Sequence, residues 1–239
     1  MATPVNTLKS PVNLLTILQT SIGKKVLMAV TGLIWIGFLV MHMYGNTKVF
    51  LGPEYFNEYA EGLRELGHPI FGHLHLLTIM RLGMTAAFIT HVYLQFALYR
   101  QNSASRSTAY AVHKKVQATP FALTMRYGGI AIFFFVLFHL ADLTWGTPGI
   151  HSEFVRGDAY HNLTMSFQSP LKVVIYLIAL FALGMHLFHG TWSMFQTLGI
   201  NTKRTTPMLR IVALVLAVLV PLGFASVPVS VLLGIVPLK

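Results

Sequence analysis

The longest uncharged run in the chain extends from Val173 to Thr202, and it constrains the fold more than any other feature. A helix needs about 20 apolar residues to cross the hydrocarbon layer of a bilayer, so this run predicts a membrane-spanning helix. His186 and His189 lie three positions apart within it, and therefore on the same side of the helix. An ionisable side chain at this depth is costly and marks a candidate functional site. The alternative is a histidine that is hydrogen-bonded to a neighbouring helix.

The composition places the whole chain in a membrane. Of its 239 residues, 54% are hydrophobic and only 10% are charged, whereas soluble domains carry about 25% charged residues. The net charge of +10 does not indicate a nucleic-acid partner, because the basic residues lie between the apolar runs, where membrane orientation explains them. The chain has no cysteine, which excludes a covalently attached haem and a thiolate-bound iron–sulfur cluster. Its eleven histidines are then the main strong metal ligands.

Hydropathy and charge predict an all-α integral membrane protein with a single bundle of five transmembrane helices. Residues 1–25 form a cytoplasmic segment with a short interfacial helix after Ser10-Pro11, where a serine cap precedes a proline. Residues 26–239 form the membrane domain. Its spans are predicted at about 26–47, 73–99, 121–145, 170–197 and 208–235.

The charges of the connecting segments predict the orientation. Five spans place the two termini on opposite sides of the membrane. The connections on the N-terminal side (1–25, 100–115 and 197–210) hold ten Lys or Arg and no acid, whereas those on the other side (46–73 and 146–169) hold three basic and six acidic residues. Because basic loops stay in the cytoplasm, the N-terminus is expected to be cytoplasmic and the C-terminus outside.

The first four spans each carry a histidine deep in the apolar run. At a rise of 1.5 Å per residue, His91 and His186 lie roughly 14 and 16 Å from the cytoplasmic edge, and His139 and His42 roughly 20 and 24 Å. Two facing imidazoles at equal depth are what a six-coordinate haem iron needs. We therefore expect an inner pair, His91 with His186, and an outer pair, His42 with His139.

Other histidine chemistry fits the pattern less well. Zinc or copper would need three or four ligands at one depth, and a proton-relay transporter would need acids beside the histidines, where only Asp142 and Arg81 offer buried charge. Small residues near the histidines would let flat porphyrins approach the backbone, although close helix packing alone explains any single glycine. These are Gly37, Gly83, Gly128, Gly129, Gly184 and Gly190.

Two motifs resemble those of a known family, the single-chain dihaem cytochrome b anchors of succinate:quinone oxidoreductases. The first span opens with Ser21-Ile-Gly-Lys-Lys25 and closes with Met41-His-Met-Tyr-Gly-Asn46. The fourth carries His186-x-x-x-Gly190-x-Trp-Ser193 and continues to Gln196-Thr-Leu-Gly199. The spacing of the first three span histidines is also similar, and the resemblance covers residues 20–235. The chain departs from the family at Gly184, where some members that reduce fumarate have an acid, so proton transfer by that route is not expected.

The resemblance implies two non-covalent b haems and a quinone, menaquinone, as substrate. It also implies a prokaryotic cytoplasmic (inner) membrane protein with a flavoprotein subunit and an iron–sulfur subunit on its cytoplasmic face. The dicarboxylate active site would then lie on another chain. The alternatives are the haem b subunit of a nitrate reductase-type or hydrogenase-type enzyme, and a non-haem five-helix transporter.

Five further residues are candidates for contacts with a haem propionate or a quinone: Arg81, His189, His75, Ser21 and Lys24. Arg81 lies inside the second span and is expected to neutralise an anion, for which a propionate fits. His189 is expected to donate or accept a hydrogen bond rather than to ligate iron. His75, like His68 and His73, has a solvated interface position as its alternative. Helix capping is the alternative for Ser21, and snorkelling is the alternative for Lys24.

Overall fold

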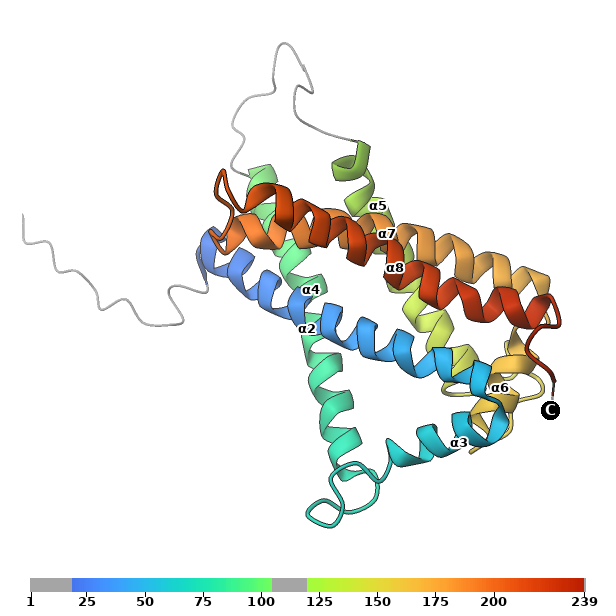
Figure 1. Cartoon of the computed structure of the whole chain (residues 1–239). Coiled ribbons are helices and arrows are strands. Elements are labelled where there is room, and N and C mark those ends of the chain that lie inside the picture. Colours follow the sequence, from blue (N-terminus) through green and yellow to red (C-terminus); the bar gives the residue numbers. More distant parts are fainter. Residues whose placement is uncertain (1–18, 105–119, 239) are drawn as a thin grey trace, which may run out of the picture.

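The computed structural model describes residues 19–104 and 120–238, and within these ranges every element is a helix. Figure 1 shows the helices in chain order. Their bounds are α2 Ser21–Thr47, the 3₁₀ helix η1 Lys48–Leu51, α3 Pro53–Gly62, α4 His75–Ala104, α5 Pro120–Leu143, α6 Ala159–Ser166, α7 Pro170–Thr197 and α8 Thr206–Leu232. Five of them, α2, α4, α5, α7 and α8, are long and apolar enough to cross a membrane. The predicted five-helix, multi-pass architecture is confirmed at this level.

The helix bounds follow the predicted spans to within five residues, and the two largest differences are the early start of α2 and the end of α4 at Ala104 rather than at 99. α2 begins at Ser21, five residues before the predicted start of the span, because the Thr20 side chain caps it by accepting a hydrogen bond from the backbone N–H of Gly23 at 3.0 Å. Lys24 therefore lies in the first turn of the helix rather than before it. α7 has the predicted bounds. The interfacial helix expected within residues 1–25 falls mostly outside the described residues.

The long helices form a bundle of unequal tightness. α7 and α8 pack closely along their length, α2 contacts both of them, α5 packs against α7, and α4 packs mainly against α2 (Figure 1). Gly184 shows how closely α7 and α8 approach, because a Cβ atom there would lie 2.9 Å from the carbonyl oxygen of Ala217. Small residues at such crossings are what permits close packing of membrane helices.

The bundle has two different ends, which we call the basic end and the α6 end. The basic end holds the start of α2, the end of α4 and the α7–α8 connection. There Lys24 Nζ donates a hydrogen bond to Gln101 Oε1 at 3.0 Å. Described basic residues at this end include Lys25, Arg100, Lys203 and Arg204.

The α6 end is built from η1, α3, α6 and the C-terminal residues (Figure 1). Asp158 caps α6 by accepting from the His161 N–H at 3.0 Å and also accepts from Asn57 of α3 at 2.9 Å. The fully buried Tyr160 donates its hydroxyl hydrogen to the Pro237 carbonyl at 2.8 Å. A hydrophobic cluster surrounds these bonds, so this end is a packed structure rather than a set of loose loops. Its buried members are Val49, Phe56, Tyr160, Leu163, Phe167, Val173, Tyr176, Val227, Val231 and Val236.

Candidate functional site

The four span histidines meet in two pairs. His42 of α2 and His139 of α5 have ring centroids 5.9 Å apart with an interplanar angle of 78°. His91 of α4 and His186 of α7 have centroids 6.3 Å apart at 61°. These are the two pairs that depth along the sequence predicts. Whether they bind iron is not tested by this geometry alone, so ligation stays a prediction.

The separation of the two pairs can be followed along α2. Thr31 of α2 contacts the inner pair, because its Oγ1 lies 3.1 Å from His91 Nδ1. His42 lies eleven positions further along the same helix. At 1.5 Å per residue, Thr31 and His42 are roughly 16 Å apart along the helix axis, which is more than the roughly 4–10 Å expected from the depths of the histidines in the sequence. The inner pair is nearer the basic end and the outer pair nearer the α6 end.

At His91, a neighbouring hydroxyl group favours a proton on Nδ1. Thr31 Oγ1 lies 3.1 Å from the carbonyl oxygen of Leu27 and 3.0 Å from that of Met28, and a carbonyl oxygen only accepts hydrogen bonds. The hydroxyl hydrogen is therefore used on the backbone, and Oγ1 accepts from His91 Nδ1–H. Nε2 of His91 is left unprotonated, which is the form that binds a metal ion.

The other inner ligand, His186, lacks such support. Its Nδ1 is buried and has no hydrogen-bond partner among the residues that the structure describes. In the outer pair, His42 lies next to Asn46, whose amide donates to the His42 carbonyl oxygen at 2.8 Å and lies 3.4 Å from His42 Nδ1. His139 Nδ1 lies 3.3 Å from the hydroxyl group of Tyr176.

The residues present fit a metal ion held between two imidazoles. Two ring nitrogens that bind one ion from opposite sides, each at roughly 2 Å, place their ring centres roughly 6 Å apart, and the observed separations are 5.9 and 6.3 Å. A Cβ atom added at Gly37, Gly83 or Gly190 would meet nothing within 4 Å, so there is open space beside the backbone at these positions. Gly184, by contrast, packs against α8.

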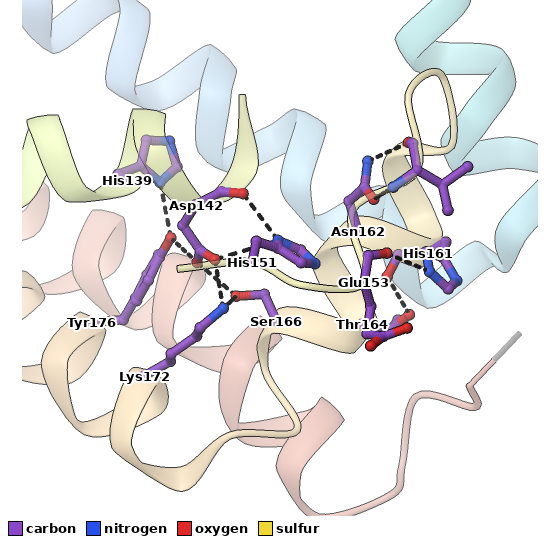
Figure 2. Close-up of polar contacts among 11 residues, drawn as sticks. His139, Asp142, His151, Glu153, His161, Asn162, Thr164, Ser166, Lys172 and Tyr176 are labelled. Carbon is purple, nitrogen blue, oxygen red and sulfur yellow. Dashed lines mark hydrogen bonds and ion pairs between the residues drawn. The ribbon is translucent and has the colours of Figure 1, made fainter. Parts of the chain in front are cut away.

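A buried polar network adjoins His139 at the α6 end (Figure 2). Its centre is Asp142, which is fully buried. Lys172 Nζ lies 2.7 Å from Asp142 Oδ1, and Ser166 Oγ and Tyr176 OH lie 2.6 and 3.1 Å from Oδ2. His151 Nδ1 contacts the Asp142 backbone carbonyl oxygen at 2.9 Å and Oδ1 at 3.3 Å. The network therefore links the outer pair, through Tyr176, to a charged cluster near the end of the bundle.

The five additional candidates are less clearly placed. Arg81 and His75 are exposed on α4, and no described residue forms an ion pair with Arg81. His189 lies one turn beyond His186 and is half-buried. Ser21 is the first residue of α2, Thr20 serves as its cap, and Lys24 bonds to Gln101. Their roles toward a propionate or quinone stay predictions.

Surface histidines before α4 have simpler partners. His73 Nδ1 lies 2.6 Å from Glu65 Oε1, and both side chains are about half exposed. Glu61 is close enough to complete a three-ligand group on this surface. Exposed acidic groups of this kind are common, so this group carries no functional assignment.

Sequence reasoning missed the residues that contact the imidazole Nδ1 atoms. Asn46, whose amide lies 3.4 Å from His42 Nδ1, follows His42 by four positions, which places both on the same helix face. Asp142, which the sequence already marks as a buried charge, follows His139 by three positions and reaches it through Tyr176. That spacing is a usable signal. Thr31 and Tyr176 lie on other helices than the histidines they contact, so only the packing of the bundle reveals them.

Comparisons of the chain with models of protein families, with curated proteins and with solved structures find no match.

Proposed function

We propose that the chain is the membrane cytochrome b subunit of a succinate dehydrogenase or fumarate reductase complex, carrying two b haems. The observation that carries the proposal is the meeting of four span histidines in two pairs, with ring centroids 5.9 and 6.3 Å apart. Both separations fit axial ligation of one iron by two imidazoles. The resemblance of the first and fourth spans to the dihaem anchors supports the same assignment.

The chain's residues would hold and orient the haems, which when bound supply one-electron redox chemistry. His91 and His186 would ligate the inner haem, and His42 and His139 the outer one. The roughly 16 Å along α2 between Thr31, which contacts the inner pair, and His42 would give each haem a different depth. Thr31 and Tyr176 would orient one imidazole in each pair, and the apolar helices would keep water from the irons.

The proposed orientation rests on the charges of the two ends, and the proposed partners rest on the resemblance to the dihaem anchors. We place the basic end in the cytoplasm, so that the C-terminus lies outside, because positively charged connections remain on that side. A flavoprotein subunit and an iron–sulfur subunit would dock there, with the dicarboxylate site on the flavoprotein. Electrons would pass between the iron–sulfur centres and a quinone, menaquinone, in a prokaryotic cytoplasmic membrane. The basic loops favour docking at this end, and orientation alone also explains their charge.

Co-purification tests this proposal. The tagged full chain would be extracted from its native membrane in mild detergent, and the chains that accompany it identified by mass spectrometry. We expect a flavoprotein and an iron–sulfur protein, together with succinate-dependent reduction of a b-type spectrum. Molybdenum-containing or nickel-containing partner chains with two haems would favour a nitrate reductase-type or hydrogenase-type complex. A colourless preparation would instead favour the transporter hypothesis.

A further inference from the structure

We infer that Tyr176 and Asp142 act as positioning residues for the outer metal site, where a tyrosine–carboxylate relay fixes the tautomer and the donor strength of His139. The inference rests on the proposed function, because it concerns how one of the proposed iron ligands is held. It gives a role to Asp142, a buried charged residue that is not needed for iron ligation itself.

The direction of each hydrogen bond follows from the charged end of the relay. Lys172 Nζ lies 2.7 Å from Asp142 Oδ1, which makes Asp142 the anionic partner of an ion pair. A carboxylate only accepts hydrogen bonds, so Tyr176 donates its hydroxyl hydrogen to Oδ2 at 3.1 Å. The tyrosine oxygen then has only lone pairs to offer His139 Nδ1 at 3.3 Å. His139 must therefore carry its proton on Nδ1 and present an unprotonated Nε2.

Packing holds the relay in place. The Tyr176 ring lies edge-on between aromatic rings, with centroids 5.0 Å from Phe135 and 4.8 Å from Phe167. Ser166 Oγ donates to Asp142 Oδ2 at 2.6 Å and Lys172 Nζ pairs with Oδ1 at 2.7 Å, so the carboxylate cannot turn away from Tyr176 without breaking these bonds. The relay joins three elements, since His139 and Asp142 lie on α5, Tyr176 and Lys172 on α7, and Ser166 at the end of α6.

The expected effect is electronic as well as geometric. Outer hydrogen-bond partners that end on a carboxylate raise the basicity of a ligating imidazole. A more basic His139 would stabilise the ferric state and lower the midpoint potential of the outer haem. Removing the relay should therefore raise that potential and weaken haem retention, whereas the inner haem, on His91 and His186, should not respond.

The experiment compares three variants of the full chain, each purified with its haems: Tyr176→Phe, Asp142→Asn and Tyr160→Phe. Tyr160→Phe is the matched control, because it also removes a buried tyrosine hydroxyl at the α6 end, one that bonds to a backbone carbonyl and not to a histidine. Redox titration monitored by optical and EPR spectra gives the potential and content of each haem separately. Outer-haem affinity is measured by transfer to an excess of apomyoglobin.

We expect Tyr176→Phe to raise the outer potential and to lower outer-haem affinity by roughly 10–100-fold, the range for partners of metal ligands. Asp142→Asn should shift the potential in the same direction, and Tyr160→Phe should change neither haem. Complete loss of the outer haem in Tyr176→Phe, with the outer haem retained in Tyr160→Phe, also supports the relay. An unchanged outer haem in both relay variants, or an equal change in the control, overturns the inference. A wild-type chain without haem contradicts the proposed function itself.

Discussion

The inner and outer pairs differ in the groups that form hydrogen bonds with their histidines. The hydroxyl group of Thr31, which contacts His91, donates its hydrogen to backbone carbonyl oxygens of its own helix. The hydroxyl group of Tyr176, which contacts His139, donates its hydrogen to the carboxylate of Asp142, and Asp142 is paired with Lys172. Both arrangements leave Nε2 unprotonated. Only the outer one connects the imidazole to a charge.

The location of each pair explains this difference. At the inner pair, a neutral hydroxyl and the backbone of α2 provide the support, which avoids the cost of a charged group in the hydrocarbon layer. The outer pair lies close to the α6 end, where α6 and the loop before it cover Asp142 and where Lys172 is still partly exposed. The same tautomer is thus obtained by local helix geometry in one place and by tertiary packing in the other.

The largest effect is expected from removing a ligand. His139→Ala and His42→Ala should each abolish the same haem, and His91→Ala and His186→Ala the other, because each pair encloses one site. Low-temperature optical spectra of the purified variants would show which component is lost. His189→Ala is the matched control and should retain both haems. If the His42 and His91 variants lost the same component, the comparison between inner and outer pairs would have no basis.

The next largest effect should come from breaking the ion pair behind the outer site. Lys172→Met leaves Asp142, with 0% exposure, as an uncompensated charge, and such changes cost about 3–5 kcal/mol. Thermal unfolding in detergent would show a large fall in Tm. Arg64→Met removes one member of an exposed pair with Glu61 and should cost less than about 1 kcal/mol. Equal shifts for the two variants would mean that the network adds no stability to the α6 end.

A smaller effect is expected at Gly184, two positions before His186. The added Cβ of Gly184→Ala would lie 2.9 Å from the Ala217 carbonyl oxygen, so α8 must move, at about 1–3 kcal/mol for an overpacked contact. Gly62→Ala, a helical position where a Cβ meets nothing within 4 Å, serves as the control and should be neutral or stabilising. Thermal unfolding would compare them. A tolerated Gly184→Ala would show that the inner pair does not depend on this close helix packing.

The smallest effect is expected from Thr31→Val, which preserves shape and removes the hydroxyl that contacts His91. Loss of one neutral hydrogen bond costs about 0.5–1.5 kcal/mol, and the inner-haem potential should shift less than the outer one does in Tyr176→Phe. A redox titration of both variants makes the comparison directly. A larger shift from Thr31→Val would reverse the proposed order of influence between neutral and charged support.

Much of the architecture could be predicted from the sequence, because long apolar runs with few charges predict membrane spans. α7 has the predicted bounds, while α2 begins earlier because the Thr20 cap and two lysines extend the helix past the apolar run. The pairing of the histidines could be predicted from their depths, because residues on helices that cross the same membrane can be compared by their distance from one membrane edge.

The support around the histidines could not be predicted in the same way. Thr31 and Tyr176 are ordinary residues of apolar helices, and nothing in their local sequence indicates that they contact His91 and His139. Their contacts depend on helix rotation and crossing, which pairs of packed side chains decide together. Likewise Gly184 serves close packing with α8 here, which the sequence alone does not distinguish from space for a porphyrin.

The most direct test of the central claim is the number of haems per chain. The full chain, purified from membranes that supply haem, would be assayed by pyridine haemochrome against protein concentration from amino-acid analysis. We expect two non-covalent b haems per chain, one for each histidine pair. A chain that retains one haem, or none, would contradict it.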